Sequence, residues 1–219
     1  MMFRLKRSAA TLFKSVKGTA FLEFGLSLPL FLGFVLTGIE TANYVMANNR
    51  VQRLSAMVAD LVAQSGAGSV GATERQIYDL FEAIDLTAKP FDLRRDGRVY
   101  ITAVRGTDTN NDRTVENRIL WQRVDGNYVA AVPVLGCAQN TTFAMLPKNR
   151  LLSLDEILFH AQVTYAYEPI FSRVPFEWLD IPTAFTRVAM FRARSTSFQS
   201  PSTVANFPPK QKCNTATGL

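Results

Sequence analysis

The stretch from Lys17 to Glu40, KGTAFLEFGLSLPLFLGFVLTGIE, constrains the rest of the chain more than any other. Its sixteen residues from Phe24 to Ile39 include no charged side chain. As an α-helix these residues span about 24 Å, and the flanking apolar residues extend the helix to the thickness of a bilayer core. We therefore expect one membrane-spanning helix. Glu23 in its first turns and Pro29 near its middle are not needed by an ordinary membrane anchor.

The formal charge of +6 comes almost entirely from the N-terminus. No acidic residue precedes Gly18, and the basic residues before it are Arg4, Lys6, Arg7, Lys14 and Lys17. The chain that follows residues 1–18 has a net charge of only +1. Because basic flanks of a membrane span stay in the cytoplasm, we interpret residues 1–18 as a cytoplasmic leader. We expect no nucleic-acid binding, since the remaining charge is nearly balanced and no binding motif is present.

The helix is predicted to continue beyond the membrane. The apolar residues that recur three and four positions apart are Val51, Leu54, Val58 and Leu61. This period predicts a single helix over residues 19–64, about 70 Å long, whose second part is an amphipathic stalk. The alternative is a secretory signal peptide cut after Val45-Met46-Ala47, so that the mature chain begins near Asn48.

Residues 65–72, SGAGSVGA, have no side chains that build a core, and they predict a hinge. A short helix is expected next, because Thr73 and Gln76 have the capping-box spacing and Pro90 closes the segment.

From Arg98 onward the sequence alternates with the period of β-strands. The predicted strands are 98–104, 117–124, 127–135, 159–169 and 183–195. The sequence therefore predicts an α+β head over residues 73–198, in which the short helix faces an antiparallel sheet of four or five strands. Residues 199–219 are expected to form an extended tail.

Cys137 and Cys213 are the only cysteines, and His160 is the only histidine, so the chain lacks a ligand set for zinc. In an exported head these cysteines are expected to form a disulfide. Closing a loop of about 77 residues restricts the unfolded chain by roughly 4–5 kcal/mol, and Cys213 would tie down the tail. In a cytosolic protein the alternative is two unrelated buried thiols.

Residues suited to catalysis are few. His160 lies in a strand pattern, where a histidine packed within the sheet is expected. The sequence has no nucleophile elbow, zinc-protease motif or phosphate loop. We therefore expect no enzyme and no cofactor. The alternative is a secreted or anchored hydrolase with a cleft around His160.

A weak candidate for a metal site lies in the predicted loop between the first two strands. Asp108, Asn110 and Asp112 have the spacing that begins a calcium loop. Arg113 and Ile119, however, stand where that loop needs Gly and Glu. A solvated hairpin loop is therefore expected.

Aromatic residues cluster at the end of the predicted strand 159–169 and in the segment that follows it. They are Tyr165, Tyr167, Phe171, Phe176 and Trp178. We expect them to pack in the core and at the edge of the head, and a partner-binding patch is the alternative.

The stretch Lys17–Glu23 resembles the processing site of type IV prepilins and pseudopilins, in which a Gly stands five positions before a Glu, between a basic leader and an apolar helix. The longer segment 21–55 resembles the TadE-like family of pseudopilins and its TadG-like relatives. The motifs that carry this resemblance are Glu23-Phe24-Gly25, Pro29 and Gly38-Ile39-Glu40. Gly25 stands where the family usually has Ala.

The resemblance implies that a prepilin peptidase cuts after Gly18, so that the mature chain begins at Thr19. It also implies that Glu23 pairs with the new α-amino group of a neighbouring subunit during assembly. A charge at the centre of a membrane span costs about 2.5–3.5 kcal/mol, so such a partner is needed. Pro29, which allows a bend that fits packed helices, and Glu40 are further candidate assembly residues.

The sequence thus predicts a single-pass inner-membrane protein with a cytoplasmic N-terminus and a periplasmic head. The resemblance implies a minor pilin or pseudopilin of a tight-adherence (Tad/Flp-type) pilus or a related secretion apparatus. Its expected partners are the prepilin peptidase, other pilins and pseudopilins, inner-membrane assembly proteins and the lipid bilayer. The alternative is a TadG-like anchored envelope protein whose leader is never cut.

Overall fold

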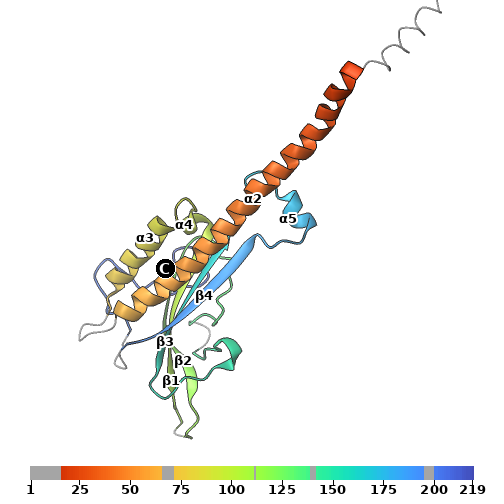
Figure 1. Ribbon diagram of the computed structural model, residues 1–219. Coiled ribbons are helices and arrows are strands. Elements are labelled where there is room, and N and C mark those ends of the chain that lie inside the picture. Colours follow the sequence, from red (N-terminus) through yellow and green to blue (C-terminus); the bar gives the residue numbers. More distant parts are fainter. Residues whose placement is uncertain (1–15, 66–71, 111, 139–141, 195–199) are drawn as a thin grey trace, which may run out of the picture. The chain divides into compact units, whose positions relative to one another are not determined.

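The computed structural model describes residues 16–65, 72–110, 112–138, 142–194 and 200–219 (Figure 1). The chain divides into two compact units, residues 1–44 and 45–219. The elements in chain order are α2 (Val16–Ser65), α3 (Glu74–Ala88), α4 (Leu93–Asp96), β1 (Gly97–Thr107), β2 (Glu116–Asp125), the 3-10 turn η1 (Pro147–Asn149), β3 (Ile157–Ala166), α5 (Val174–Trp178) and β4 (Ala184–Arg192). The predicted α+β class is confirmed.

The helix α2 confirms the long helix predicted over residues 19–64. It is continuous for 50 residues and runs through Pro29 without interruption, although Pro29 has no amide hydrogen to donate to the carbonyl of Gly25. By length and composition it is able to cross a membrane. Its first part exposes large apolar side chains, among them Phe21, Leu26 and Phe34.

The second part of α2 packs in the larger compact unit, which begins at Val45 and contains the sheet. Val51, Leu54 and Val58 are buried as the periodicity predicts, but the stripe continues through Val62, and Leu61 is 41% exposed. At about 100° per residue, Val62 lies about 20° from Val51 around the helix axis, whereas Leu61 lies about 80° away. Residues 66–71 of the predicted hinge lie outside the described residues.

The helix α3 begins with the predicted capping box. The Thr73 hydroxyl accepts a hydrogen bond from the Gln76 amide at 3.3 Å, and the Thr73 amide donates to the Gln76 side chain at 2.9 Å. Its buried face carries Ile77, Phe81 and Ile84. In the larger unit, α3 runs back beside the last turns of α2 (Figure 1).

The sheet has four antiparallel strands in the order β2-β1-β3-β4. A fifth strand predicted over residues 127–135 is wrong, because that segment forms turns. Its backbone groups are satisfied by side chains of the sheet. Gln162 donates to the Val132 carbonyl at 2.8 Å and accepts from the Val134 amide at 2.7 Å. The segment therefore crosses a face of the sheet and does not extend its edge.

The two faces of the sheet carry different side chains. One carries buried apolar side chains of β1 and β3, namely Val99, Ile101, Ala103, Phe159, Ala161 and Val163. On the other face, Val104 and Leu158 pack with Leu135, Ala144, Leu146 and Leu152 of the segment between β2 and β3. The predicted disulfide is confirmed, with the Cα atoms of Cys137 and Cys213 6.1 Å apart.

Candidate assembly site

The first turns of α2 hold the predicted processing and assembly residues. Thr19 and Glu23 are four residues apart in the helix and therefore lie on one face, about 6 Å apart along the axis. Both side chains are exposed, and they are surrounded by exposed apolar residues, including Phe21, Leu22 and Phe24. Gly18 lies in the same helix. The carboxylate is therefore presented outward from an apolar helix surface.

Three other polar side chains of this helix donate hydrogen bonds to carbonyls of the helix itself. Ser27 donates to the Phe24 carbonyl at 3.2 Å, and Thr37 and Thr41 donate to carbonyls one turn earlier, each at 2.8 Å. Glu23 has no ion-pair partner among the described residues. A carboxylate in an apolar span is costly unless it is paired.

Cleavage between Gly18 and Thr19 would change the electrostatics of this helix end. Thr19 would become the first residue of α2, with a charged amine beside the unpaired amide groups of the first helical turn. Those amides carry the positive end of the helix dipole, which favours a carboxylate such as Glu23 nearby. The remaining assembly candidates lie farther along α2: Pro29 on an exposed stretch and Glu40 at a buried position.

Comparison with known proteins concerns this same segment. Residues 18–60 match the TadE-like protein family. The match begins at Gly18 and covers most of α2, but none of the sheet. It confirms the predicted TadE-like resemblance of the N-terminal segment. No curated protein and no solved structure matched the chain.

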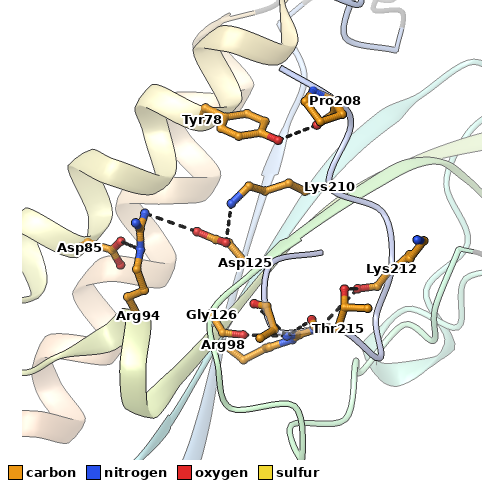
Figure 2. A network of polar contacts seen from close by, with 11 residues as sticks. Tyr78, Asp85, Arg94, Arg98, Asp125, Gly126, Pro208, Lys210, Lys212 and Thr215 are labelled. Atoms are coloured by element: carbon orange, nitrogen blue, oxygen red, sulfur yellow. Dashed lines mark hydrogen bonds and ion pairs between the residues drawn. The ribbon is translucent and has the colours of Figure 1, made fainter. Parts of the chain in front are cut away.

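In the head, a charged network joins α3, α4, β2 and the tail (Figure 2). Asp125, at the end of β2, accepts from the Lys210 ammonium at 2.5 Å and lies 3.7 Å from Arg94. Arg94 in turn pairs with Asp85 of α3 at 2.7 Å. The Tyr78 hydroxyl donates to the Pro208 carbonyl at 2.7 Å. The tail is therefore held against the head by far more than its predicted disulfide.

Arg98 is the second anchor of the tail (Figure 2). Its side chain is fully buried, and its guanidinium donates to the carbonyls of Gly126 at 2.7 Å, Cys213 at 2.7 Å and Thr215 at 2.6 Å. A planar guanidinium with five donors suits such convergent carbonyls. Sequence reasoning missed this residue, whose only signal is an arginine at the start of an otherwise buried strand.

A buried ion pair attaches α3 to the sheet. The Arg123 guanidinium contacts both carboxylate oxygens of Glu74, and its Nε lies 3.0 Å from each. Both side chains are buried, and Arg123 also lies 5.6 Å from the Trp121 ring. Sequence reasoning missed this pair, too. The only hint in the sequence is that Arg123 lies two positions after Trp121 in a strand pattern, which puts both side chains on the same face of the sheet.

His160 lies within β3, opposite Thr102 of β1 and Met190 of β4. It is buried, and neither ring nitrogen has a hydrogen-bond partner among the described residues. Burial lowers the pKa of His160 to about 4. The structure therefore contains the expected histidine packed within a strand.

The calcium candidates lie in the loop between β1 and β2, where they form local turns. Asn110 donates to the Asp112 carboxylate at 2.8 Å. The Arg113 amide donates to Asp108 and the Thr114 amide to Asp112, at 3.0 and 2.7 Å. The hydrogen bonds that Asp112 accepts lower the pKa of its carboxyl group, and the bond from the Thr114 amide has the largest effect. Backbone amides thus bind one carboxylate oxygen of Asp108 and one of Asp112.

The aromatic cluster divides into two sets. Tyr165, Tyr167 and Phe176 are buried, with the Tyr167 and Phe176 rings 6.0 Å apart. Phe171 and Trp178 are exposed. Core packing therefore explains only the first set.

Proposed function

We propose that this protein is a minor pilin or pseudopilin of a Tad/Flp-type pilus or a related secretion apparatus, anchored in the inner membrane by α2. One observation carries the proposal: a Gly and a Glu five residues apart begin an apolar helix in the segment that matches the TadE-like family. That family match supports association with a pilus apparatus. In the proposed topology the basic leader is cytoplasmic and the disulfide-linked head is periplasmic.

In the proposed mechanism, a prepilin peptidase cleaves after Gly18 and creates the α-amino group of Thr19. Glu23 of one subunit then pairs with that amine on a neighbouring subunit while their helices pack side by side. The amine does not exist before cleavage, so processing acts as the switch for assembly. The pairing also removes the cost of an uncompensated carboxylate in the bilayer.

The first test is the N-terminus of the protein isolated from cell membranes. N-terminal sequencing and intact mass should give a mature chain that begins at Thr19. A chain that keeps residues 1–18 would contradict the pseudopilin and indicate the anchored TadG-like alternative. A chain that begins near Asn48 would indicate a secretory signal peptide.

The second test is Glu23→Ala, with Ser27→Ala as the matched control. Ser27 is exposed one turn farther along α2 and bonds only to its own helix. We expect Glu23→Ala to lose co-purification with the pilus assembly and Ser27→Ala to keep it. Unchanged processing and incorporation of Glu23→Ala would contradict the role of this carboxylate.

A further inference from the structure

Lys210 differs from the other lysines of the larger compact unit in its surroundings. Its ammonium lies 2.5 Å from Oδ1 of Asp125, at the end of β2, and both side chains are only 9% exposed. The other three lysines of this unit, Lys89, Lys148 and Lys212, are exposed. Lys210 thus holds an amino group against a carboxyl group, away from bulk water.

The backbone and the neighbouring rings fix this contact in addition to the opposite charges. The Val124 amide donates to the Lys210 carbonyl at 2.9 Å, so the tail lies directly beside the end of β2. The Lys210 ammonium also lies over two rings of α3, 4.8 Å from the centroid of Tyr78 and 5.6 Å from that of Phe81. The two side chains are therefore held together in a largely water-free site.

Arg94 lies beside the other carboxylate oxygen of Asp125 (Figure 2). Its guanidinium is 3.7 Å from Oδ2, whereas Lys210 contacts Oδ1. The charge of Arg94 is in turn balanced by Asp85, which lies 2.7 Å from its Nε. A cation placed there stabilises negative charge that develops on Oδ2. The carboxyl group thus has an amine at one oxygen and a stabilising cation at the other.

We infer that Lys210 and Asp125 condense to an intramolecular amide, an isopeptide bond between the tail and β2. A proton first passes from the ammonium to Oδ1, which also relieves the cost of burying two charges. The neutral nitrogen then attacks Cγ of Asp125, and a C–N bond forms as negative charge moves onto Oδ2. Finally the Cγ–Oδ1 bond breaks, and Oδ1 leaves as water with one proton from the nitrogen. The step needs no oxidant, reductant or cofactor.

The residue types and their placement favour this reaction at one buried ion pair and exclude it at the other. The guanidinium of Arg123, paired with Glu74, stays protonated, whereas a buried lysine can lose its proton and act as a nucleophile. Groups held in the correct geometry react as if each were present at about 10⁵–10⁸ M. Exclusion of water also protects the product from hydrolysis.

The bond would tie the tail to β2 independently of the disulfide. Reduction of Cys137–Cys213 would then leave the tail covalently attached to the sheet. This inference concerns the head alone and does not depend on the proposed role in a pilus.

The test is mass spectrometry of the full chain purified from cells, after denaturation, reduction and thiol alkylation. We expect the wild type to be lighter by one water molecule than the mass calculated from its observed N-terminus. Trypsin should release residues 124–148 and 195–212 as one branched peptide, because it does not cut after an acylated lysine. A wild type of full mass that gives two separate peptides would overturn the inference, whatever the variants show.

The branched peptide also distinguishes the isopeptide bond from another loss of water. Asp125 is followed by Gly126, whose amide could attack the same carboxyl group and form a cyclic imide. That product has the same mass, but trypsin would still cut after Lys210 and the two peptides would separate. Such a result would refute the isopeptide bond.

Lys210→Arg keeps the positive charge but removes the nucleophile, so this variant should have its full mass and give separate peptides. The matched control is Lys212→Arg, because Lys212 is exposed two positions farther along the tail. It should keep both the loss of water and the branched peptide. A branched peptide that persists in Lys210→Arg, or that disappears in Lys212→Arg, would contradict the assignment to Lys210.

Discussion

At the level of single residues, His160 gives the head a defined sensitivity to acid. Its pKa is lowered from 6.5 to about 4 by burial, so the folded state favours the neutral ring. This contribution to stability is fully present above about pH 6.5 and is lost as the pH falls toward 4. We expect the free energy of unfolding to fall by about 2 kcal/mol between about pH 7.5 and pH 5, measured by denaturant titration in detergent.

The control is His160→Leu, which removes both unpaired ring nitrogens and the titration. Its unfolding free energy should vary much less over the same pH window. Glu156 does not add to this pH dependence. Hydrogen bonds, of which that from Arg192 has the largest effect, lower the pKa of Glu156 to about 2, so its carboxylate stays ionised in this pH window. Equal pH dependence in wild type and His160→Leu would contradict this assignment.

The Glu74–Arg123 pair provides a prediction about a buried charge. Glu74→Gln leaves the buried guanidinium of Arg123 without its counter-charge, and we expect a loss of about 3–5 kcal/mol in unfolding free energy. Glu74→Leu combined with Arg123→Leu should cost much less, because no charge remains unpaired. A double variant that is as unstable as the single variant would show that packing, not charge, is responsible.

At the level of elements, the tail over residues 200–219 is fastened by several independent contacts. Arg98 donates hydrogen bonds to carbonyls of the tail, Lys210 forms an ion pair with Asp125, and Cys213 forms the disulfide. We expect Arg98→Met to raise amide hydrogen exchange across the last residues of the tail even while the disulfide is intact. The double variant Cys137→Ala/Cys213→Ala should lower the free energy of unfolding by up to roughly 4–5 kcal/mol. It should nevertheless keep much of the protection of the tail amides from hydrogen exchange.

The elements differ in how far the sequence predicts them. Helix α3 and the four strands follow from local signals, namely the Thr73–Gln76 capping box and the alternation of apolar residues. Residues 127–135 also have strand composition, but Gln162 and Tyr100 bind that backbone from the sheet face. These side-chain hydrogen bonds take the place of strand pairing, and they form only in the folded state. The partners of Arg98 in the tail lie more than 100 positions away, beyond the reach of any local pattern.

For the candidate assembly site, the sequence carries most of the information, since the Gly18–Glu23 spacing and the apolar run lie within one helix. What the structure adds is that the larger compact unit begins at Val45, within that helix. A linear pattern of apolar residues predicts a buried stripe but not what covers it. The exposure of Trp178 beside the buried Phe176 was likewise not predictable, because both occur in one aromatic-rich segment.

At the level of the whole molecule, the distribution of charge is expected to set the orientation. All five basic residues of the leader precede Gly18, and the rest of the chain is nearly neutral. In the proposed topology, replacing these five residues by Gln removes the basic flank that favours a cytoplasmic N-terminus. We expect a substantial fraction of the variant to insert with its head in the cytoplasm.

The disulfide gives this prediction a simple measurement. Cys137 and Cys213 form their bond in an oxidising compartment and stay reduced in the cytosol, so the redox state reports on which side the head lies. After trapping of thiols in intact cells, the wild type should migrate as the oxidised form and the leader variant largely as the reduced form. Protease added to spheroplasts should degrade the head of the wild type and spare that of the variant. A fully oxidised, protease-accessible head in the variant would show that the leader charges do not determine the topology.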